Sequence, residues 1–452
     1  MVMADDGDDR PRLRASEAAA LLYIGAPLAL FFAWFLQPAI GLPCLAGLAF
    51  IAWRMRHAVD RPEPTSIDLW LVSIAFVWTL LAGIWPIGGQ GLDWLKHSAV
   101  LNLLVSDAWP PMYEGQYLRY VVGWYLIPAG LAKVMPAQLE VLVGLWTCLG
   151  VYLSLRLVTN VAGVRFAAFV FVLFSGADIL GYLITQFAIM PLHYEWWSGW
   201  GQISSTTTSL FWTPQHAIPG WLIIGLVMGS RFPITRIGGA IGAAVLLWSP
   251  FTVAGLAPFM VYRWARDGLT SPLTLTNVVG AAIALPILAY LTSGIASVPA
   301  AFAWSTPQFT WAKWALLMLI EWGVLAGFLA LALRSKQERA LLAVAAATLA
   351  ILPFAYVGAV NDLMMRGTQP AVAVLAILSA IAISRRPAAV TGVIAVLSVG
   401  AVTAFAEVAR NAKSPRHSAP SVTLTMAMPT PDFLVQYLAP RPFGIRDREP
   451  PR

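Results

Sequence analysis

The sequence predicts an all-α polytopic membrane protein with about 12–14 transmembrane helices, some of them short or broken. Of its 452 residues, 59% are hydrophobic and only 11% are charged, whereas soluble domains are about 45–50% apolar. The mean hydropathy is +0.71. Apolar runs approach the length of about 20 residues that a helix needs to cross a bilayer, and they follow one another along most of the chain. The net charge of +7 is then a topology signal, which argues against a nucleic-acid partner.

The apolar runs give the predicted elements in order. They cover residues 18–36, 38–53, 68–87, 118–135, 138–157, 162–174, 178–190, 217–229, 237–262, 274–294, 312–333, 340–357, 369–384 and 388–407. The stretch 162–190 is interrupted at 175–178, and the stretch 237–262 is interrupted at Ser249 and Pro250. Broken helices at membrane depth usually line a cavity. We therefore predict one transmembrane domain over 1–407, followed by a C-terminal tail over 408–452.

The positions of the basic residues predict the sidedness. Arg10, Arg12 and Arg14 place the N-terminus in the cytoplasm, because cytoplasmic flanks carry the excess of Lys and Arg. The third run then leads outward. The predicted outside segments are about 88–117, 191–216, 295–311 and 358–368, together with the tail.

The first outside loop carries the highest density of charge. Asp93, Lys96 and His97 are spaced i, i+3 and i+4, so on a helical turn they share one face. Asp93 suits a general base or a metal ligand, and Lys96 or His97 could tune its pKa or hold a phosphate. The alternative is a solvated turn at the membrane surface with an internal ion pair.

The same loop continues with aromatic residues and two further charges. Trp109 and Tyr113 could stack on a sugar, or they could anchor the loop at the membrane interface. Glu114 is a candidate contact to the sugar or acceptor. Arg119 is a candidate phosphate ligand, because a guanidinium binds phosphate through two parallel hydrogen bonds.

The second outside loop contains two groups of candidates. His193, Glu195 and Trp196 are expected to contact the sugar or the acceptor. Gln215 and His216 follow a proline that can begin a helix, and free N–H groups in a first helical turn attract phosphate. Both histidines could instead be interfacial residues that hydrogen-bond within the protein.

A metal site is open at this stage. Asp93, His193, Glu195 and His216 could together bind a divalent ion such as Mg²⁺ or Mn²⁺, but no spacing among them is diagnostic. No cofactor is otherwise indicated.

A last polar pair opens the run at 369–384. Asp362 and Arg366 are spaced i, i+4 and could simply pair with each other. In the functional interpretation, Arg366 binds a lipid phosphate and Asp362 orients it. The chain has no phosphate-binding P-loop, dinucleotide glycine fingerprint, G-x-S-x-G or H-E-x-x-H motif, which disfavours soluble-type nucleotide chemistry.

The arrangement resembles the GT-C fold class of membrane glycosyltransferases, and related uncharacterised bacterial polytopic membrane proteins. The resemblance begins with Asp93 at the start of the first large outside loop. It continues through the residues Ala99, Leu103, Leu104, Trp109, Pro110, Pro111, Leu155, Arg156, Leu157 and Gly163, and then a broken helix pair.

The resemblance implies an inverting transferase in a bacterial inner membrane. It implies a polyprenyl-phosphate-linked sugar donor and an envelope glycan, lipid or protein as acceptor, with chemistry on the periplasmic or exterior face. In that class the acidic residue at the position of Asp93 is the catalytic carboxylate.

Two other functions fit the same sequence. A glycan polymerase or ligase would share the outside-facing chemistry. A transporter or flippase for a lipid-linked or small polar substrate would also use broken helices, and Asp178 at membrane depth would suit it. Charges that gather on one face, without a visible internal repeat, favour the enzyme.

Overall fold

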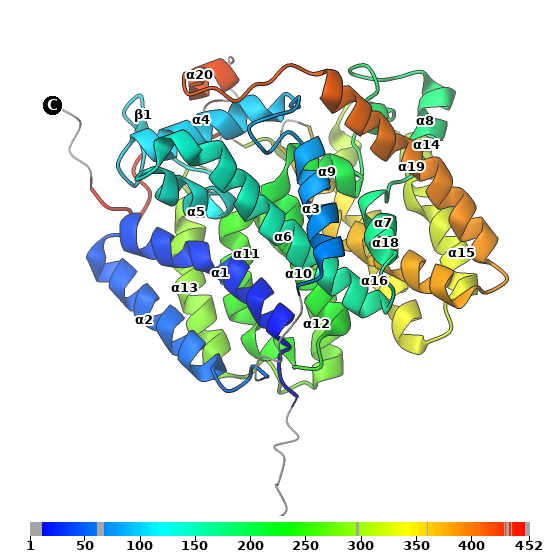
Figure 1. Ribbon diagram of the computed structural model, residues 1–452, viewed down its shortest axis with the longest axis horizontal. Coiled ribbons are helices and arrows are strands. Elements are labelled where there is room, and N and C mark those ends of the chain that lie inside the picture. The colour runs from blue at the N-terminus through cyan, green and yellow to red at the C-terminus, as the bar shows by residue number, and fades with distance from the viewer. Residues whose placement is uncertain are drawn as a thin grey trace, which may run out of the picture.

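The computed structural model describes residues 11–60, 67–294, 298–358, 360–428, 430, 434 and 436–447, and it is predominantly helical (Figure 1). Within these residues, eight helices are long and apolar enough to cross a membrane. They are Ala15–Trp34, Pro38–Met55, Pro136–Ala162, Leu275–Thr292, Trp311–Ala332, Lys336–Phe354, Asp362–Arg385 and Val390–Lys413. Shorter apolar helices cover Leu69–Leu81 and Ile234–Trp248. The protein is therefore an all-α polytopic membrane protein, as predicted.

The helices of the first half run from α1 to α10. They are α1 (Ala15–Trp34), α2 (Pro38–Met55), α3 (Leu69–Leu81), α4 (Asp93–Ser106), α5 (Gly123–Ala132), α6 (Leu139–Ala162), α7 (Ala167–Val172), α8 (Asp178–Thr185), α9 (Thr206–Trp212) and α10 (Pro214–Gly229). The second half has α11 (Gly238–Trp248), α12 (Pro250–Asp267), α13 (Leu275–Thr292), α14 (Trp311–Met318), α15 (Val324–Ala332), α16 (Lys336–Ile351), α17 (Asp362–Gly367), α18 (Gln369–Arg385), α19 (Val390–Lys413) and α20 (Leu424–Ala427).

Two small sheets complete the described structure. Strands β1 (Met112–Tyr113), β2 (Gln116–Leu118) and β5 (Leu438–Ala439) form one antiparallel sheet in the order β1-β2-β5. Strands β3 (Ala300–Phe302) and β4 (Ala355–Val357) form the other.

The predicted count of about 12–14 helices includes short or broken ones, and several apolar runs do fold as helices too short to be counted among the eight long ones. The runs at 162–174 and 178–190 become α7, with six residues, and α8, with eight. Such helices are roughly 10 Å long at 1.5 Å per residue, which is far less than a bilayer core of about 30 Å. The break between them, predicted at 175–178, is present.

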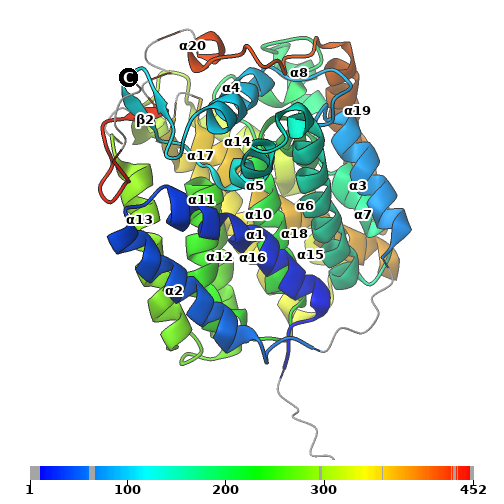
Figure 2. The same ribbon diagram turned by 60° about the vertical axis from the view of Figure 1, so that its left-hand side comes forward.

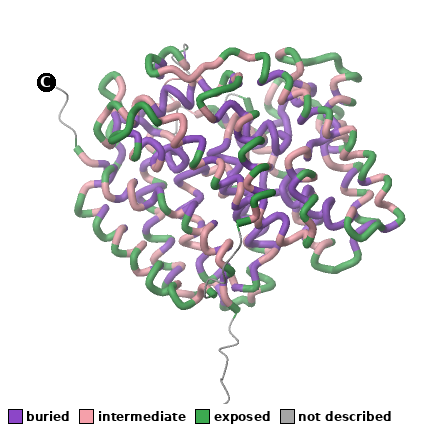
Figure 3. Tube along the Cα trace, in the orientation of Figure 1, coloured by how far each residue is buried: buried purple, intermediate pink, exposed green. Residues whose placement is uncertain are grey.

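The core lies around α10 and α18, which pack against each other. Nearly every residue of both helices is buried, and a helix that is apolar all round belongs in an interior. Figure 3 shows the buried trace at the centre and the exposed trace at the periphery. Peripheral helices instead expose large apolar side chains such as Leu42, Leu285 and Leu331, which suits a surface in contact with lipid.

The second predicted break forms a helical hairpin. The Ser249 hydroxyl accepts a hydrogen bond from the Thr252 N–H (3.0 Å) and so caps α12. Pro250 suits the first helical position because its missing N–H would be unpaired there. The hydroxyl of Thr235, which precedes α11, donates a hydrogen bond to the carboxylate of Asp267 at the end of α12 (2.8 Å). The start of α11 and the end of α12 therefore lie on the same side of the molecule.

The tail differs from the predicted boundary. The helix α19 continues to Lys413, so residue 407 lies inside a helix. The described part of residues 414–447, here called the C-terminal cap, is then ordered against the first outside loop. Gln90 accepts hydrogen bonds from the N–H groups of His417 and Ser418, Asn102 donates to the carbonyl of Ala419, and β5 pairs with β2.

Two elements of the predicted outside segments, α4 of the first loop and α20 of the tail, lie at the same end of the molecule. Figures 1 and 2 both place them, together with α8, at the end opposite the start of α1. We call this the α4 end. Of the basic residues used to predict sidedness, Arg10 lies outside the described residues, as do residues 295–297 and 359 of the later outside segments.

Candidate functional site

A cavity of about 220 Å³ at the α4 end joins residues from three predicted polar clusters. We call it the α4–α17 cavity. Its lining residues are Asp93, Ile189, Met190, His193, Trp196, Gln202, Ser204, Thr208, Ser209, Trp212, Thr213, Val360, Met365 and Arg366. A larger pocket of about 600 Å³ lies between α4 and α6, and Glu140 is the only charged residue in its described lining. The smaller cavity is the candidate site because ionisable groups from distant segments meet there.

Asp93 is the first residue of α4 and pairs with Lys96 one turn later. The Lys96 Nζ atom lies 2.7 Å from Asp93 Oδ2. Burial opposes the charge of Asp93, but Lys96 and then His97 outweigh it, so the pKa of the carboxyl is below its usual value. Burial likewise opposes the charge of Lys96, but the Asp93 carboxylate raises the pKa of the ammonium. The pair is therefore ionised at neutral pH.

His97 belongs to the same helical face but has its partners inside the protein. One ring nitrogen, Nδ1, lies 2.7 Å from the Tyr125 hydroxyl, and Nε2 lies 2.8 Å from the Trp212 carbonyl. A carbonyl only accepts, so Nε2 carries the hydrogen and Nδ1 accepts from Tyr125. Burial, followed by the Lys96 charge, lowers the pKa of His97 to about 3. Both ring nitrogens of His97 are therefore bonded within the protein, and the prediction that Lys96 or His97 holds a phosphate is carried in this structure by Lys96 alone.

Arg366 reaches the cavity from α17. Its Nη2 atom lies 2.9 Å from Asp362 Oδ1, and its guanidinium carbon lies 5.8 Å from the centre of the Phe251 ring. The predicted i, i+4 pair is therefore formed, and Arg366 also lines the cavity. Because a guanidinium carries five N–H donors, pairing with one carboxylate oxygen leaves donors for a second anion.

Gln215 and His216 lie behind the cavity wall and are not among its lining residues. The His216 Nδ1 atom lies 2.7 Å from the Ser249 hydroxyl, and its ring centre lies 6.1 Å from that of Phe251, the ring on which Arg366 rests. The backbone N–H of His216 donates to the Thr213 carbonyl. This N–H was predicted to be free for an anion, and in the structure it is not. Gln215 donates to the Tyr120 hydroxyl (3.2 Å).

In the second outside loop, His193 and Trp196 line the cavity, whereas the Glu195 side chain is buried among other side chains of the protein. Glu195 accepts hydrogen bonds from Gln202 Nε2 (3.0 Å) and Thr208 Oγ1 (2.6 Å). Burial, followed by the carboxyl groups of Asp178 and Glu407, raises the pKa of Glu195 well above its ordinary value. Glu195 therefore holds two cavity-lining residues in place and is not itself among the lining residues; its predicted contact with the sugar or acceptor stays a prediction.

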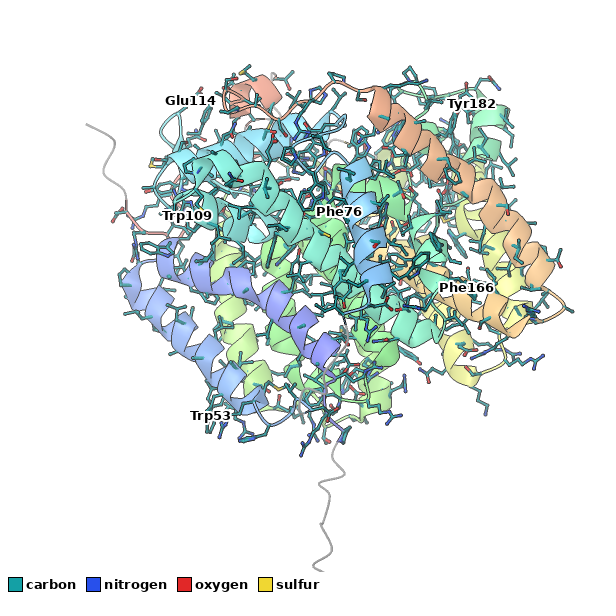
Figure 4. The ribbon with its side chains drawn as sticks, in the orientation of Figure 1. Trp53, Phe76, Trp109, Glu114, Phe166 and Tyr182 are labelled. Atoms are coloured by element: carbon teal, nitrogen blue, oxygen red, sulfur yellow. The ribbon has the colours of Figure 1, made fainter. Side chains whose placement is uncertain are left out.

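The remaining aromatic and basic candidates of the first outside loop lie away from the cavity. Trp109 donates to the Leu104 carbonyl and packs against Phe35, the residue that follows α1. The Tyr113 hydroxyl lies 2.6 Å from Thr425 Oγ1 of α20, and Glu114 accepts from the same Thr425 hydroxyl (3.4 Å). Figure 4 shows Glu114 beside α20 and Trp109 on the side of α1 and α2.

Arg119 is also structural. It donates to the carbonyls of Leu291 (3.4 Å) and Gln436 (2.5 Å), and so ties β2 to α13 and to the C-terminal cap. Arg119 is not among the lining residues of the α4–α17 cavity, so its predicted role as a phosphate ligand stays a prediction that this cavity does not support.

Sequence reasoning missed a buried ion pair on α19 that supports the cavity wall. Glu407 pairs with Arg410 and accepts a hydrogen bond from Trp212 Nε1 (2.5 Å). The Arg410 guanidinium carbon lies 4.8 Å from the centre of the Trp212 ring. The signal was present as two opposite charges three residues apart at the end of an apolar run, since ionisable residues in such a segment are usually functional.

Among the described residues, no group of three or more His, Cys, Asp or Glu side chains lies close enough to hold a metal ion. Of the four proposed metal ligands, Asp93 and His193 line the cavity. Glu195 and His216 are occupied by the internal hydrogen bonds described above. The cavity therefore offers carboxylate, imidazole, guanidinium, amide and hydroxyl groups around two indole rings.

No protein-family model, curated protein or solved structure matches this chain.

Proposed function

We propose that the protein is a membrane glycosyltransferase that moves a sugar from a polyprenyl-phosphate-linked donor to an acceptor hydroxyl at the α4 end. The observation that carries the proposal is that Asp93 of α4 and Arg366 of α17 line one cavity. Glycosyl transfer from a phosphate needs a base for the acceptor proton and a cation for the departing anion. The two residues supply one of each.

The ionisation of the site supports this division of roles. The Asp93 carboxylate, kept ionised by Lys96, takes the proton of the acceptor hydroxyl as its oxygen attacks the anomeric carbon. The bond between that carbon and the phosphate oxygen breaks, and its electron pair leaves with the polyprenyl phosphate. The phosphate gains one negative charge, which the Arg366 guanidinium stabilises through a charge-assisted hydrogen bond.

The other lining residues suit a sugar ring. Trp196 and Trp212 offer aromatic faces, and Gln202, Ser204 and Thr208 offer polar side chains. The cavity, at about 220 Å³, is smaller than the roughly 300–1,000 Å³ of typical pockets for drug-sized ligands. It therefore suits the reacting sugar and phosphate, and the prenyl chain would lie along the lipid-facing surface of the helices.

The wider proposal follows from the resemblance to the GT-C class. The α4 end faces the periplasm or exterior of a bacterial inner membrane, and the acceptor is an envelope glycan, lipid or protein. A polymerase or ligase of lipid-linked glycans would use the same two groups on a longer substrate. Arg366 lies near the start of a candidate span, a position from which it can reach a lipid phosphate at the membrane surface.

The test is transfer of a labelled sugar from a polyprenyl-phosphate donor in membranes that contain the protein. We expect Asp93→Asn to lower the rate by about 10²- to 10⁴-fold, the usual contribution of general-base catalysis. Glu114→Gln is the matched control, because this carboxylate lies at the same end but outside the cavity lining. Full activity of Asp93→Asn would contradict the proposal.

A second candidate function, a proton-coupled transporter or flippase, rests on a different pair of residues. The carboxyl groups of Asp178 and Glu321 are both buried and lie close enough to interact, and one oxygen of each, Asp178 Oδ1 and Glu321 Oε2, has no hydrogen-bond partner among the described residues. Glu321 also accepts from Trp197 Nε1 (2.8 Å) and belongs to the π-helical turn Leu319–Gly323, a distortion frequent at functional sites. Ionisable residues at membrane depth often carry protons in transporters.

The two functions predict opposite results for one variant. In the transferase, Glu321→Gln should leave sugar transfer within a factor of about two, because the residue lies outside the α4–α17 cavity. In a proton-coupled transporter, the same change should abolish pH-driven uptake or flipping in vesicles. If Glu321→Gln abolishes uptake or flipping while Asp93→Asn retains it, the transporter is favoured.

A further inference from the structure

A buried polar cluster lies behind part of the wall of the α4–α17 cavity. It consists of His193, Trp212, Glu407 and Arg410, and we call it the α19 cluster. The His193 ring stacks on the Trp212 ring with centres 5.4 Å apart and planes 29° apart, while Glu407 binds Trp212 and Arg410. The first two residues line the cavity, and the two residues of α19 lie behind them. The cluster therefore connects a buried carboxylate to a cavity-lining imidazole.

The orientation of His193 leaves one of its nitrogens for a ligand. Its Nδ1 atom lies 3.7 Å from Glu407 Oε2, and it is buried without a hydrogen-bond partner. This distance is longer than a hydrogen bond, but such contacts often tighten when substrate binds. With Nδ1 directed at Glu407, Nε2 is on the opposite side of the ring, and the ring itself lines the cavity.

We propose that His193, oriented by Glu407, is a second proton-carrying residue of the α4–α17 cavity and donates a proton to the departing phosphate. This inference rests on the proposed transfer reaction. Imidazole is the side chain best suited to exchange protons near neutral pH. An adjacent carboxylate fixes which ring nitrogen of a histidine carries the hydrogen.

The proton balance of the step is complete. The acceptor hydroxyl gives its proton to Asp93 as the new glycosidic bond forms. The bond from the anomeric carbon to the phosphate breaks, and the phosphate oxygen takes the Nε2 proton of the His193 imidazolium. The cycle ends with a protonated Asp93, a neutral His193 and a singly protonated polyprenyl phosphate. The two side chains then return to their starting states by exchanging protons with water.

The charged groups around His193 come from three elements. Glu407 and Arg410 face it from α19. Asp93 from α4 and Arg366 from α17 share the cavity with it. Because Arg410 pairs with Glu407 and also rests on Trp212, it is engaged within the cluster. His193 is therefore the residue of the cluster placed to reach the phosphate.

The test measures binding of a probe that keeps the same charge between pH 5.5 and 8.5. Methyl farnesyl phosphate is suitable, because a phosphodiester with a prenyl chain has no second ionisation in this range, unlike a phosphate monoester with its second pKa of about 6. Affinity for the purified full-length protein is measured by calorimetry at four pH values. We expect the wild type to bind about tenfold more tightly at the acidic end, where a protonated His193 adds a charge-assisted hydrogen bond.

Three variants separate the explanations. His193→Gln should lose the pH dependence and bind as the wild type does at pH 8.5. His193→Arg should bind tightly at every pH, but it should transfer sugar slowly because it cannot release a proton. His417→Gln is the matched control, because His417 lies at the same end, in the C-terminal cap, and is bonded through its backbone to Gln90. Thermal unfolding of each variant shows whether the fold is retained.

Further probes identify the source of the effect. Farnesol should show no pH dependence, and inorganic phosphate should bind weakly if the site requires a prenyl chain. An unchanged pH profile in His193→Gln overturns this inference and leaves the transferase proposal standing. If the wild type does not bind the probe at all, both are contradicted. If binding depends on His193 but Asp93→Asn transfers sugar normally, the phosphate site stands and the proposed reaction fails.

Discussion

The Nζ atom of Lys96 lies 2.7 Å from Oδ2 of Asp93 across one turn of α4, so a buried ammonium holds the carboxylate that lines the cavity. The interaction lowers the pKa of Asp93 and raises that of Lys96. The lowered pKa of Asp93 stabilises the folded protein, and this stability is lost only as the pH falls through the folded-state pKa of Asp93. The raised pKa of Lys96 also stabilises it, and that stability is lost only as the pH rises through the folded-state pKa of Lys96. At neutral pH both contributions are present.

Replacement of Lys96 should therefore change the pH profile of activity. In Lys96→Met the burial of Asp93 remains but the ammonium charge is gone, so the pKa of Asp93 rises. We expect the acid limb of the rate–pH profile to move to higher pH, with about a tenfold loss of rate for each unit below the new pKa. Lys413→Met, a change at an exposed residue at the end of α19, should leave the profile unchanged. An unmoved acid limb in Lys96→Met would show that the base is not Asp93.

Acid should destabilise the protein through His97. Its pKa in the folded state is about 3, compared with about 6.5 in an unfolded chain. Between these values the unfolded chain binds the extra proton, so stability falls as the pH falls, by about 1.4 kcal/mol per unit from this residue. Thermal unfolding in detergent at pH 7, 6, 5 and 4 measures the slope, which should be smaller in His97→Gln. An identical slope in both proteins would show that His97 does not cause the acid sensitivity.

Arg366 should matter more for its shape than for its charge. Arg366→Gln should lower the specificity constant by about 10²- to 10³-fold, the scale of removing one donor to a developing anion. Arg366→Lys keeps the charge but loses the planar fork, so we expect a loss of about tenfold. Arg385→Lys is the control, because Arg385 pairs with Glu338 outside the cavity lining. Equal activity of Arg366→Gln and wild type in the transfer assay would exclude Arg366 from phosphate binding.

The packing of α12 against α17 gives a test that does not touch an ionisable group. A Cβ atom on Gly255 would lie 1.8 Å from the Gly367 carbonyl oxygen, so Gly255→Ala must push α17 away and displace Arg366. We expect a clear loss of both thermal stability and activity. Gly327→Ala is the matched control, because its Cβ would meet nothing within 4 Å in the interior of α15. There alanine should be neutral or stabilising by up to about 1 kcal/mol.

Sequence reasoning predicted local features better than depth or boundaries. The breaks before Asp178 and at Ser249 follow from residues that interrupt or cap helices, and the pairing of Asp93 with Lys96 follows from helical spacing. Periodicity does not distinguish a short buried helix from a spanning one, so the sequence alone does not show that the runs at 162–174 and 178–190 fold as the short helices α7 and α8. The tail boundary was wrong because charges at the end of α19 were taken for the end of the helix.

The candidate site was predictable only in part for a similar reason. Asp93, His193, Trp196 and Arg366 are chemically suited to a site and do line one cavity. Trp109, Tyr113 and Glu114 have the same chemical character, but they pack against the residue that follows α1 and against α20. Only the folded arrangement separates the two groups, because loops rich in aromatic residues serve equally well in binding and in packing. Glu407 and Arg410 reach the site from a helix whose end sequence reasoning misplaced.

The C-terminal cap imposes an order on biosynthesis. All eight long helices precede it in the chain, whereas its contacts with Gln90, Asn102 and β2 join residues made near the start to residues made near the end. The membrane helices can therefore be inserted before the contacts of the cap form, and the α4 end is completed only after the cap itself has been synthesised.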